Sequence, residues 1–194
     1  MPNQKAFVLW FTGLPCSGKT TLSNEVKKEI NSYGLNLEQL DGDLVRQRKV
    51  VPLGYSKEDR MTHVAGVVSQ ALGFTQDGII TLVSLISPYR MMREYARRMI
   101  DCFVEIYVRC PLAVCESRDV KGMYHLAREG KLKHFTGVSD PYEEPMAPEL
   151  VVETDVLTIE ASSRKVITYL KDRELIPFQP LQRTAGTQKR YAVK

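Results

Sequence analysis

The chain has 194 residues, of which 43% are apolar and 26% are charged. These values fit one globular domain with a sizeable core. The net charge of +4 comes from residues 176–194, which hold four basic residues and no acid, so residues 1–175 hold 23 basic and 23 acidic residues. Because a nucleic-acid binder concentrates lysine and arginine on one face of its fold, this distribution argues against nucleic acid as the main partner. It indicates a neutral domain followed by a solvated basic tail.

The sequence carries no signal for a membrane or for export. No apolar run approaches the roughly 18 residues of a membrane span. The early apolar run at 6–11 follows Lys5 without the cleavage site of a signal peptide. We therefore expect a cytoplasmic protein with no membrane partner. Its four cysteines lack metal-ligand spacing, and we expect them to stay reduced in that compartment.

Short apolar or β-branched runs alternate with longer helical segments. The runs predict five strands, at 6–12, 35–40, 79–86, 103–108 and 150–152. Leu22, Val26 and Ile30 recur every four residues and predict a helix after the first strand. Further helices are predicted at 57–72, at 88–100 with Ser87 as its cap, and at 163–175. This alternation is typical of an α/β fold, a parallel sheet with helices on both faces.

Residues 119–148 break the alternation with three glycines, three prolines and several basic residues. A segment longer than about 12–15 residues without secondary structure is usually functional or disordered. Its basic residues, together with Phe135 and Tyr142, favour a mobile lid over an anionic ligand.

A phosphate-binding motif directly follows the first strand. It matches the pattern G-x-x-x-x-G-K-[ST] in full and is followed by the first predicted helix, the context that this motif requires. Its residues are Gly13, Leu14, Pro15, Cys16, Ser17, Gly18, Lys19 and Thr20. Backbone N–H groups and the helix N-terminus can bind the phosphates of ATP, the lysine can reach the outer phosphates, and the threonine can ligate Mg²⁺. The motif predicts a P-loop NTPase-type sheet that uses ATP and Mg²⁺.

Two carboxylates, Asp41 and Asp43, follow the second strand, with Arg46 nearby. Ligands of such sheets collect at the carboxyl ends of the strands, so we expect both to face the phosphate loop. One of them can orient or deprotonate an acceptor hydroxyl, or hold Mg²⁺. An Asx turn that merely starts a helix is the alternative.

Ser87 follows the third strand, and Arg90 and Arg93 lie in the first turns of the next helix. Cations are disfavoured at a helix N-terminus, which suggests anions nearby. Ser87 can be the helix cap or a nucleophile, but no candidate base adjoins it in sequence.

Several segments resemble adenylylsulfate kinases. They are GLPCSGKTTL at 13–22, LDGDLVR at 40–46, LGYSKEDR at 53–60, LISPYR at 85–90, the DVKG and FTG stretches within 103–137, and DPYEEPMAPEL at 140–150. The phosphate loop alone is common to many kinases, whereas the run of DVKG, FTG and PYE is much more specific. The resemblance implies transfer of the ATP γ-phosphate to the 3′-hydroxyl of adenosine 5′-phosphosulfate.

The resemblance also implies roles for individual residues. Arg46 and Arg60 would contact the phosphosulfate, Tyr55 and Phe135 would clamp the adenine of the acceptor, and Ile86 and Ser87 would touch the same substrate. Lys121 would approach the transferring phosphoryl group, and Arg118 would border the adenine of ATP. The catalytic set is then Lys19, Asp43, Ser87 and Lys121, with Asp41 and His63 in the acceptor pocket and with Thr20 and Asp43 as metal ligands. In the family the serine is described as a phosphoserine intermediate, but we prefer direct in-line transfer. A homodimer and a functional link to ATP sulfurylase are further implications.

The chain departs from the family pattern on the acceptor side. His63 stands where the family has asparagine, Ala65 and Gly66 replace two arginines, and Leu44 replaces another asparagine. A kinase of the same fold with another nucleotide or small-alcohol acceptor, or a non-catalytic nucleotide-binding module, are therefore the alternatives. We predict a kinase domain at 1–175, with a lid at 119–148, and a basic tail at 176–194.

Overall fold

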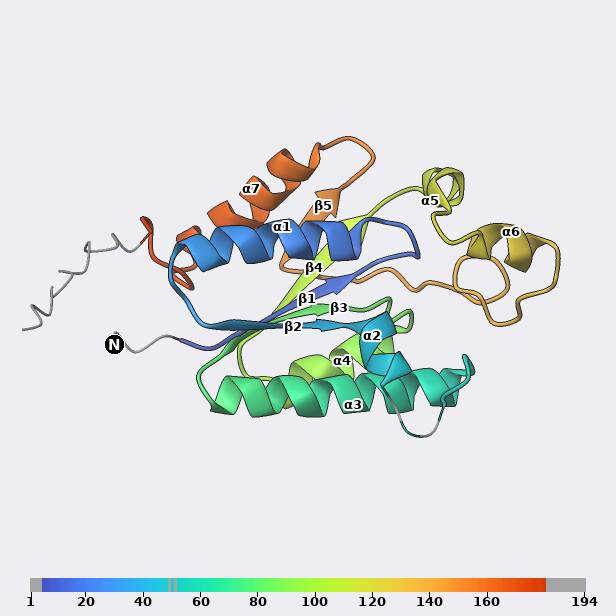
Figure 1. Ribbon diagram of the computed structural model, residues 1–194, viewed down its shortest axis with the longest axis horizontal. Coiled ribbons are helices and arrows are strands. Elements are labelled where there is room, and N and C mark those ends of the chain that lie inside the picture. Colours follow the sequence, from blue (N-terminus) through green and yellow to red (C-terminus); the bar gives the residue numbers. More distant parts are fainter. Residues whose placement is uncertain (1–4, 49, 51, 181–194) are drawn as a thin grey trace, which may run out of the picture.

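The structure is a computed structural model that describes residues 5–48, 50 and 52–180. Its centre is a five-stranded sheet with the order β2-β3-β1-β4-β5, and all pairs are parallel (Figure 1). The strands are β1 (Val8–Thr12), β2 (Leu37–Asp41), β3 (Ile80–Ser84), β4 (Phe103–Arg109) and β5 (Leu150–Glu153). The predicted five-stranded parallel sheet is confirmed, with every strand end within two residues of its expected place.

Helices cover both faces of the sheet (Figure 1). α1 (Lys19–Ser32) and α7 (Ile159–Asp172) lie on one face, and α3 (Lys57–Gln76) and α4 (Arg90–Met99) lie on the other. Three shorter helices, α2 (Gly42–Gln47), α5 (Leu112–Arg118) and α6 (Met123–Arg128), lie at the end of the sheet where the strands finish. No helix of the described residues is long and apolar enough to cross a membrane.

The central strand β1 shows why the sequence forms these layers. Side chains of a strand alternate between the two faces of the sheet. Leu9 and Phe11, with Phe7 just before the strand, are fully buried in the core under α1 and α7. Val8 and Trp10 are fully buried under α3 and α4. A strand buried on both faces must be apolar throughout, as this one is.

The start of α4 corrects the prediction that Ser87 caps it. The helix begins at Arg90, and Ser87 has a positive φ of 39° with its hydroxyl directed elsewhere. The carboxylate of Glu143 accepts the backbone N–H of Arg90 at 2.7 Å instead. The cap therefore comes from a residue 53 positions away in sequence, which local pattern cannot show.

Two other segments differ from expectation. The stretch predicted as a long mobile loop contains α6, a helix of six residues. The carboxylate of Asp119 accepts the backbone N–H groups of Tyr124 and His125 and so caps this helix. α7 begins four residues before its predicted start, since the Thr158 side chain accepts the N–H of Ala161. Most of the predicted basic tail, from residue 181 on, lies outside the described residues.

The order of the strands places the site. β1 lies at the centre of the sheet, between β3 and β4. The strands β2 and β3 therefore lie on one side of it, and β4 and β5 lie on the other. Parallel sheets bind their ligands at such a switch point, beyond the carboxyl ends of the strands. The motif at 13–20 follows β1 at this point, and the lid at 119–148 lies at the same end of the molecule (Figure 1).

Candidate active site

The phosphate loop is a tight turn between β1 and α1. A Cβ on Gly13 would lie 2.4 Å from the carbonyl oxygen of Val108, so only glycine fits against β4 here. Gly18 has a φ of 94°, the left-handed region that glycine adopts without strain. Both glycines of the motif are therefore required by the backbone path and allow the loop to curl.

Every carbonyl oxygen of the loop accepts a hydrogen bond. Lys19 Nζ donates to the oxygens of Gly13 at 3.1 Å and of Leu14 at 2.6 Å. Each of the next four oxygens accepts from a different group. Tyr124 Oη donates to Pro15, Arg118 to Cys16, Thr154 Oγ1 to Ser17 and the N–H of Leu22 to Gly18. Within the loop, the N–H of Ser17 also donates to the oxygen of Leu14. The bonds on the carbonyls fix the peptide planes of the loop, and the remaining backbone N–H groups of such a loop are groups that bind phosphate.

Lys19 is the cation of this loop. It is only 9% exposed, and burial lowers its pKa to about 8, although nearby Cys115 and Asp43 oppose the shift. Beside it, the hydroxyl of Ser17 is buried and has no hydrogen-bond partner among the described residues. A buried ammonium, an unpartnered hydroxyl and the backbone N–H groups at the start of α1 are groups that a polyphosphate satisfies. The residues present therefore fit ATP.

The two aspartates that follow β2 have different partners. The Asp41 carboxylate accepts the N–H groups of Asp43 and Leu44, which starts α2, and also the hydroxyl of Thr20 at 2.8 Å. The predicted Asx turn and the predicted position facing the phosphate loop are thus both found in Asp41. Asp43 instead forms an ion pair of 2.7 Å with Lys121 of the lid. Oxygen ligands suit Mg²⁺, so Thr20 and Asp41 fit that ion as a pair.

Tyr55 joins the two arginines of the acceptor side. The guanidinium carbons of Arg46 and Arg60 lie 4.8 Å and 5.5 Å from the centre of its ring. Arg46 also donates to the carbonyls of Leu53 and Gly54, and Arg60 to that of Tyr55. Burial lowers the pKa of Arg60, mainly through desolvation, yet a guanidinium remains charged. Two cations beside one aromatic ring make a site for an anionic group attached to a planar ring.

One cavity of about 620 Å³ connects these groups. It is lined by the predicted nucleotide-binding residues Pro15, Cys16, Gly18, Lys19, Thr20 and Arg118, and by Asp41, Asp43, Arg46, Tyr55, Arg60, His63, Ile86, Ser87, Lys121 and Phe135. Gly13 and Ser17 lie buried behind this wall, and Leu14 packs against the lid. The structure thus brings together 16 of the 19 predicted site residues on one surface, with the other three directly behind it.

Ser87 has a defined hydrogen-bonded place at the end of β3. Its Oγ accepts from Trp10 Nε1 at 3.1 Å and donates to Thr12 Oγ1 at 3.0 Å, and its side chain is 1% exposed. Thr12 in turn bonds Tyr142 Oη at 2.9 Å, and Arg93 donates to the backbone oxygen of Ser87. A hydroxyl engaged in this way is a structural link between two strand ends and the lid.

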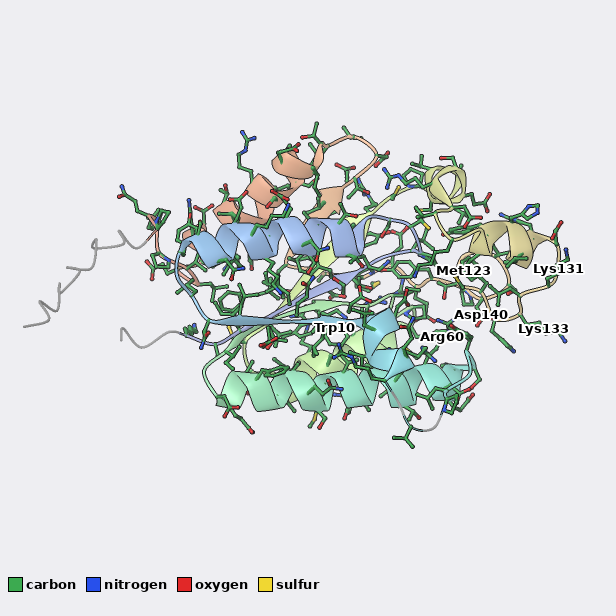
Figure 2. All side chains as sticks on the ribbon, in the orientation of Figure 1. Trp10, Arg60, Met123, Lys131, Lys133 and Asp140 are labelled. Carbon is green, nitrogen blue, oxygen red and sulfur yellow. The ribbon has the colours of Figure 1, made fainter. Side chains whose placement is uncertain are left out.

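The anions expected near α4 belong to the chain itself. Arg93 pairs with Glu105 at 2.9 Å, and the N–H of Arg90 with Glu143. Several lid cations are paired in the same manner, Arg128 with Glu116 and Lys131 with Glu129. Figure 2 shows Lys131 at the outer edge of the lid, whereas Met123 and Arg60 lie toward the cavity. The number of basic residues in the lid therefore overstates the charge that it offers a ligand.

Sequence reasoning missed Tyr124 and Thr154 as donors to the phosphate loop. Thr154 directly follows β5, so the rule that ligands gather at strand ends could have indicated it. Tyr124 lies in the unpredicted helix α6, and no local signal connects it with residue 15.

Known proteins share this arrangement. The sequence profile described as adenylylsulphate kinase matches residues 5–153. This chain belongs to the adenylylsulphate kinase family. A relative from Halothermothrix orenii named adenylyl-sulfate kinase is 49% identical over 176 residues, which cover 91% of this chain and 95% of the relative. One from Archaeoglobus fulgidus, named probable adenylyl-sulfate kinase, is 50% identical over 77% of this chain and 97% of its own.

Solved structures of adenylylsulphate kinases have the same fold. The Mycobacterium tuberculosis APS kinase CysC, in complex with AMPPNP and APS, matches with a TM-score of 0.82 at 34% identity, over 86% of this chain and 98% of that chain. A gluconokinase from Sinorhizobium meliloti, at 15% identity and a TM-score of 0.59, shares the fold alone. The family and the α/β P-loop fold predicted from the residues are confirmed.

Proposed function

We propose that this chain transfers the γ-phosphoryl group of ATP to the 3′-hydroxyl of adenosine 5′-phosphosulfate, giving ADP and 3′-phosphoadenylylsulfate. The observation that carries the proposal is the single cavity, which joins a complete phosphate loop to two arginines stacked on Tyr55. One end suits a triphosphate and the other an anionic nucleotide. Family membership supports the same reaction.

On the nucleotide side, the loop N–H groups bind the phosphates and Lys19 balances charge on the leaving β-phosphate oxygen. Thr20 and the adjacent carboxylates Asp41 and Asp43 are the ligands that we propose for Mg²⁺. When bound, this ion supplies further neutralisation of the phosphate charge. Arg118, which already holds the carbonyls of Cys16 and Thr154, borders the adenine of ATP in our proposal.

On the acceptor side, Asp43 orients the 3′-hydroxyl and accepts its proton as the new oxygen–phosphorus bond forms and the bond to the β-phosphate oxygen breaks. Its present partner Lys121 keeps its proton, because the hydrogen bond and charge of Asp43 raise the lysine pKa. We propose that Lys121 then approaches the transferring phosphoryl group. The lid that carries it excludes water, which would otherwise hydrolyse ATP.

The rest of the pocket holds the acceptor. We propose that Arg46 and Arg60 bind its phosphosulfate and that Tyr55 and Phe135 clamp its adenine, with Ile86 and His63 alongside. Ser87 shapes the wall, and phosphoryl transfer is direct.

An acceptor panel with γ-labelled ATP tests this function. Adenylylsulfate should become labelled with one ADP formed per product, while other nucleotides and sugar alcohols should not. Labelling of another acceptor but not of adenylylsulfate would establish the alternative kinase that the departure at 62–66 suggests. No ATP consumption with any acceptor would establish the non-catalytic module.

Lys19→Met is the variant that ties activity to the loop. We expect kcat to fall about 10²- to 10³-fold, the usual effect of losing one charge-stabilising donor in the transition state. Lys28→Met, on the exposed side of the same helix, is the matched control and should keep normal activity. Near-normal transfer by Lys19→Met would overturn the assignment of the phosphate loop.

We further propose a cytoplasmic homodimer with a functional link to ATP sulfurylase, the class of enzyme whose product this chain consumes. Light scattering of the purified protein tests the dimer. Coupled synthesis of 3′-phosphoadenylylsulfate from sulfate and ATP, with a sulfurylase added, tests the link.

A further inference from the structure

Tyr124 is a residue of the lid that contacts the phosphate loop. It is on α6, its side chain is 2% exposed, and its hydroxyl donates to the carbonyl oxygen of Pro15 at 3.0 Å. The aromatic ring packs in a small core that contains Leu14 and Cys16 from the loop and Phe135 from the lid. The residue is therefore in contact with the wall of the nucleotide site without lining the cavity itself.

The hydrogen bond to Pro15 orients one peptide of the loop. Because the peptide is planar and trans, fixing the Pro15 oxygen toward α6 directs the N–H of Cys16 to the opposite side, where both residues line the cavity. Cys16 has a positive φ of 59°, a conformation that a residue with a side chain adopts only at a cost. In the described part of the chain, the lid's contribution to holding the loop carbonyls is this hydroxyl. The other donors are Lys19, Arg118, Thr154 and the N–H groups of Ser17 and Leu22.

The ring of Tyr124 also contacts Phe135 of the lid. Tyr124 and Phe135 form an edge-to-face pair with centroids 4.9 Å apart and an angle of 83°. Phe135 lines the cavity. Such a pair has a preferred geometry, so a ligand that moves the Phe135 ring also acts on the tyrosine.

One feature fixes the position of Tyr124, and another keeps its hydroxyl protonated. The Asp119 carboxylate accepts the backbone N–H of Tyr124 at 3.0 Å and so fixes the start of α6. Burial raises the pKa of the tyrosine, which favours the protonated hydroxyl that donates this hydrogen bond. The ring and the hydroxyl are thus held between the two halves of the site.

We propose that Tyr124 is a positioning residue that couples the two substrates: its hydroxyl holds the phosphate loop in the binding conformation, and its ring transmits occupancy of the Phe135 side to that loop. The second half of this statement rests on the proposed function, since it assumes that adenylylsulfate occupies the pocket. The first half does not.

The first experiment needs no acceptor. Calorimetric titration of wild type and Tyr124→Phe with a non-hydrolysable ATP analogue and Mg²⁺ measures the effect of the hydroxyl alone, because phenylalanine keeps the ring. We expect Kd to rise about three- to tenfold, the effect of one hydrogen bond between neutral groups. The stoichiometry should stay at wild-type level, whereas a merely structural defect lowers the stoichiometry and leaves Kd unchanged. Tyr169→Phe, on α7, is the matched control. An unchanged Kd in Tyr124→Phe would overturn the proposal, whatever the acceptor.

The second experiment measures the coupling. The Kd of the ATP analogue is determined with and without saturating adenylylsulfate. Wild type should bind the analogue more tightly with the acceptor present, and Tyr124→Phe should lose most of this difference. Equal coupling in both proteins, or none in wild type that binds adenylylsulfate, would refute transmission through Tyr124. Failure of wild type to bind adenylylsulfate would instead refute the proposed function, and it leaves the first experiment valid.

Discussion

Lys19 is a buried cation that its own loop holds through two carbonyl oxygens. Burial lowers its pKa to about 8, so the free protein loses this charge at a lower pH than an ordinary lysine would. The protonated form is the one that attracts phosphate. Binding of ATP therefore depends on a proton that is present below pH 8 and is lost above it.

We predict that kcat/KM for ATP is constant from neutral pH to about 8 and then falls up to about tenfold per pH unit, since kcat/KM reports the ionisations of the free enzyme. A pH profile at saturating acceptor measures this. The decline of kcat should begin at a higher pH than the decline of kcat/KM, because the phosphates of bound ATP favour the charged form of Lys19 and so raise its pKa in the complex. A kcat/KM that stays level to pH 10 would contradict the role of Lys19.

Ser87 gives a second prediction at this scale. Ser87→Ala should keep transfer within about threefold of wild type and should lower the free energy of unfolding by about 1–3 kcal/mol, because Trp10 Nε1 loses its buried acceptor. Denaturant unfolding and steady-state assay measure the two effects. Complete loss of transfer in a folded variant, or a phosphorylated Ser87 in wild type during turnover, would favour a covalent intermediate.

At the scale of elements, sequence periodicity was sufficient for the sheet and the long helices, because burial on both faces demands continuous apolar strands and regular helical spacing. Local pattern was also sufficient for the phosphate loop. It failed for α6 and for the start of α4, whose caps are side-chain contacts. The Glu143 carboxylate on the N–H of Arg90 joins residues 53 positions apart, and such a pair has no signature in either segment.

The lid turn at Gly137 gives a prediction for an element. A Cβ there would lie 3.0 Å from Leu14 Cδ2 and 3.1 Å from Leu112 Cδ1, at a φ of 93°. Gly137→Ala should therefore push the lid away from the phosphate loop, raise KM for ATP by about threefold or more, and increase ATP hydrolysis without acceptor.

Gly122→Ala is the matched control for this variant. Gly122 also has a positive φ, of 65°, but a Cβ there meets no atom within 4 Å. The Gly122→Ala substitution should lower the free energy of unfolding by about 1–2 kcal/mol, because alanine is strained in the left-handed region, and it should change KM little. Equal effects of the two substitutions on KM and on hydrolysis would show that the Leu14 contact has no part in closure.

At the scale of the whole molecule, an ionic network joins α4 to the sheet. Glu105 on β4 pairs with Arg93 at 2.9 Å and with Arg97 at 3.2 Å, and Arg97 also pairs with Glu149 just before β5. Arg93 is 3% exposed, so its charge depends on this partner. The pairs with Glu105 join two consecutive elements, whereas the pair of Arg97 with Glu149 spans 52 positions. The sequence showed only that anions were to be expected near Arg93.

Glu105→Gln should lower the free energy of unfolding by about 3–5 kcal/mol, because it leaves Arg93 charged, buried and without its main counter-ion. Denaturant unfolding measures the loss, and Glu94→Gln on the exposed side of α4 is the control. KM values of the folded fraction should stay normal, since Glu105 lies outside the cavity lining. A loss below about 1 kcal/mol would show that the buried Arg93 does not depend on the charge of Glu105.

The net charge of +4 gave little information about the ligand, because the site depends on where cations lie. Lys19 and Arg60 are buried in the cavity wall, while Lys131 is neutralised at the outer edge of the lid. Residue types and order predicted the first two through the motif and the resemblance. The pairing of lid cations required the folded chain.

The complete set of bonds on the carbonyls from Gly13 to Gly18 bears on transplanting the site into another scaffold. Three of the donors, on Arg118, Tyr124 and Thr154, lie at least 98 residues downstream of the motif. An octapeptide grafted onto a different strand–helix junction brings its lysine and its glycines but leaves three backbone oxygens free to turn toward the ligand, where they repel phosphate. A working graft must therefore include the end of β5, the end of α5 and the helix of the lid, and the smallest transferable unit of this site is nearly the whole domain.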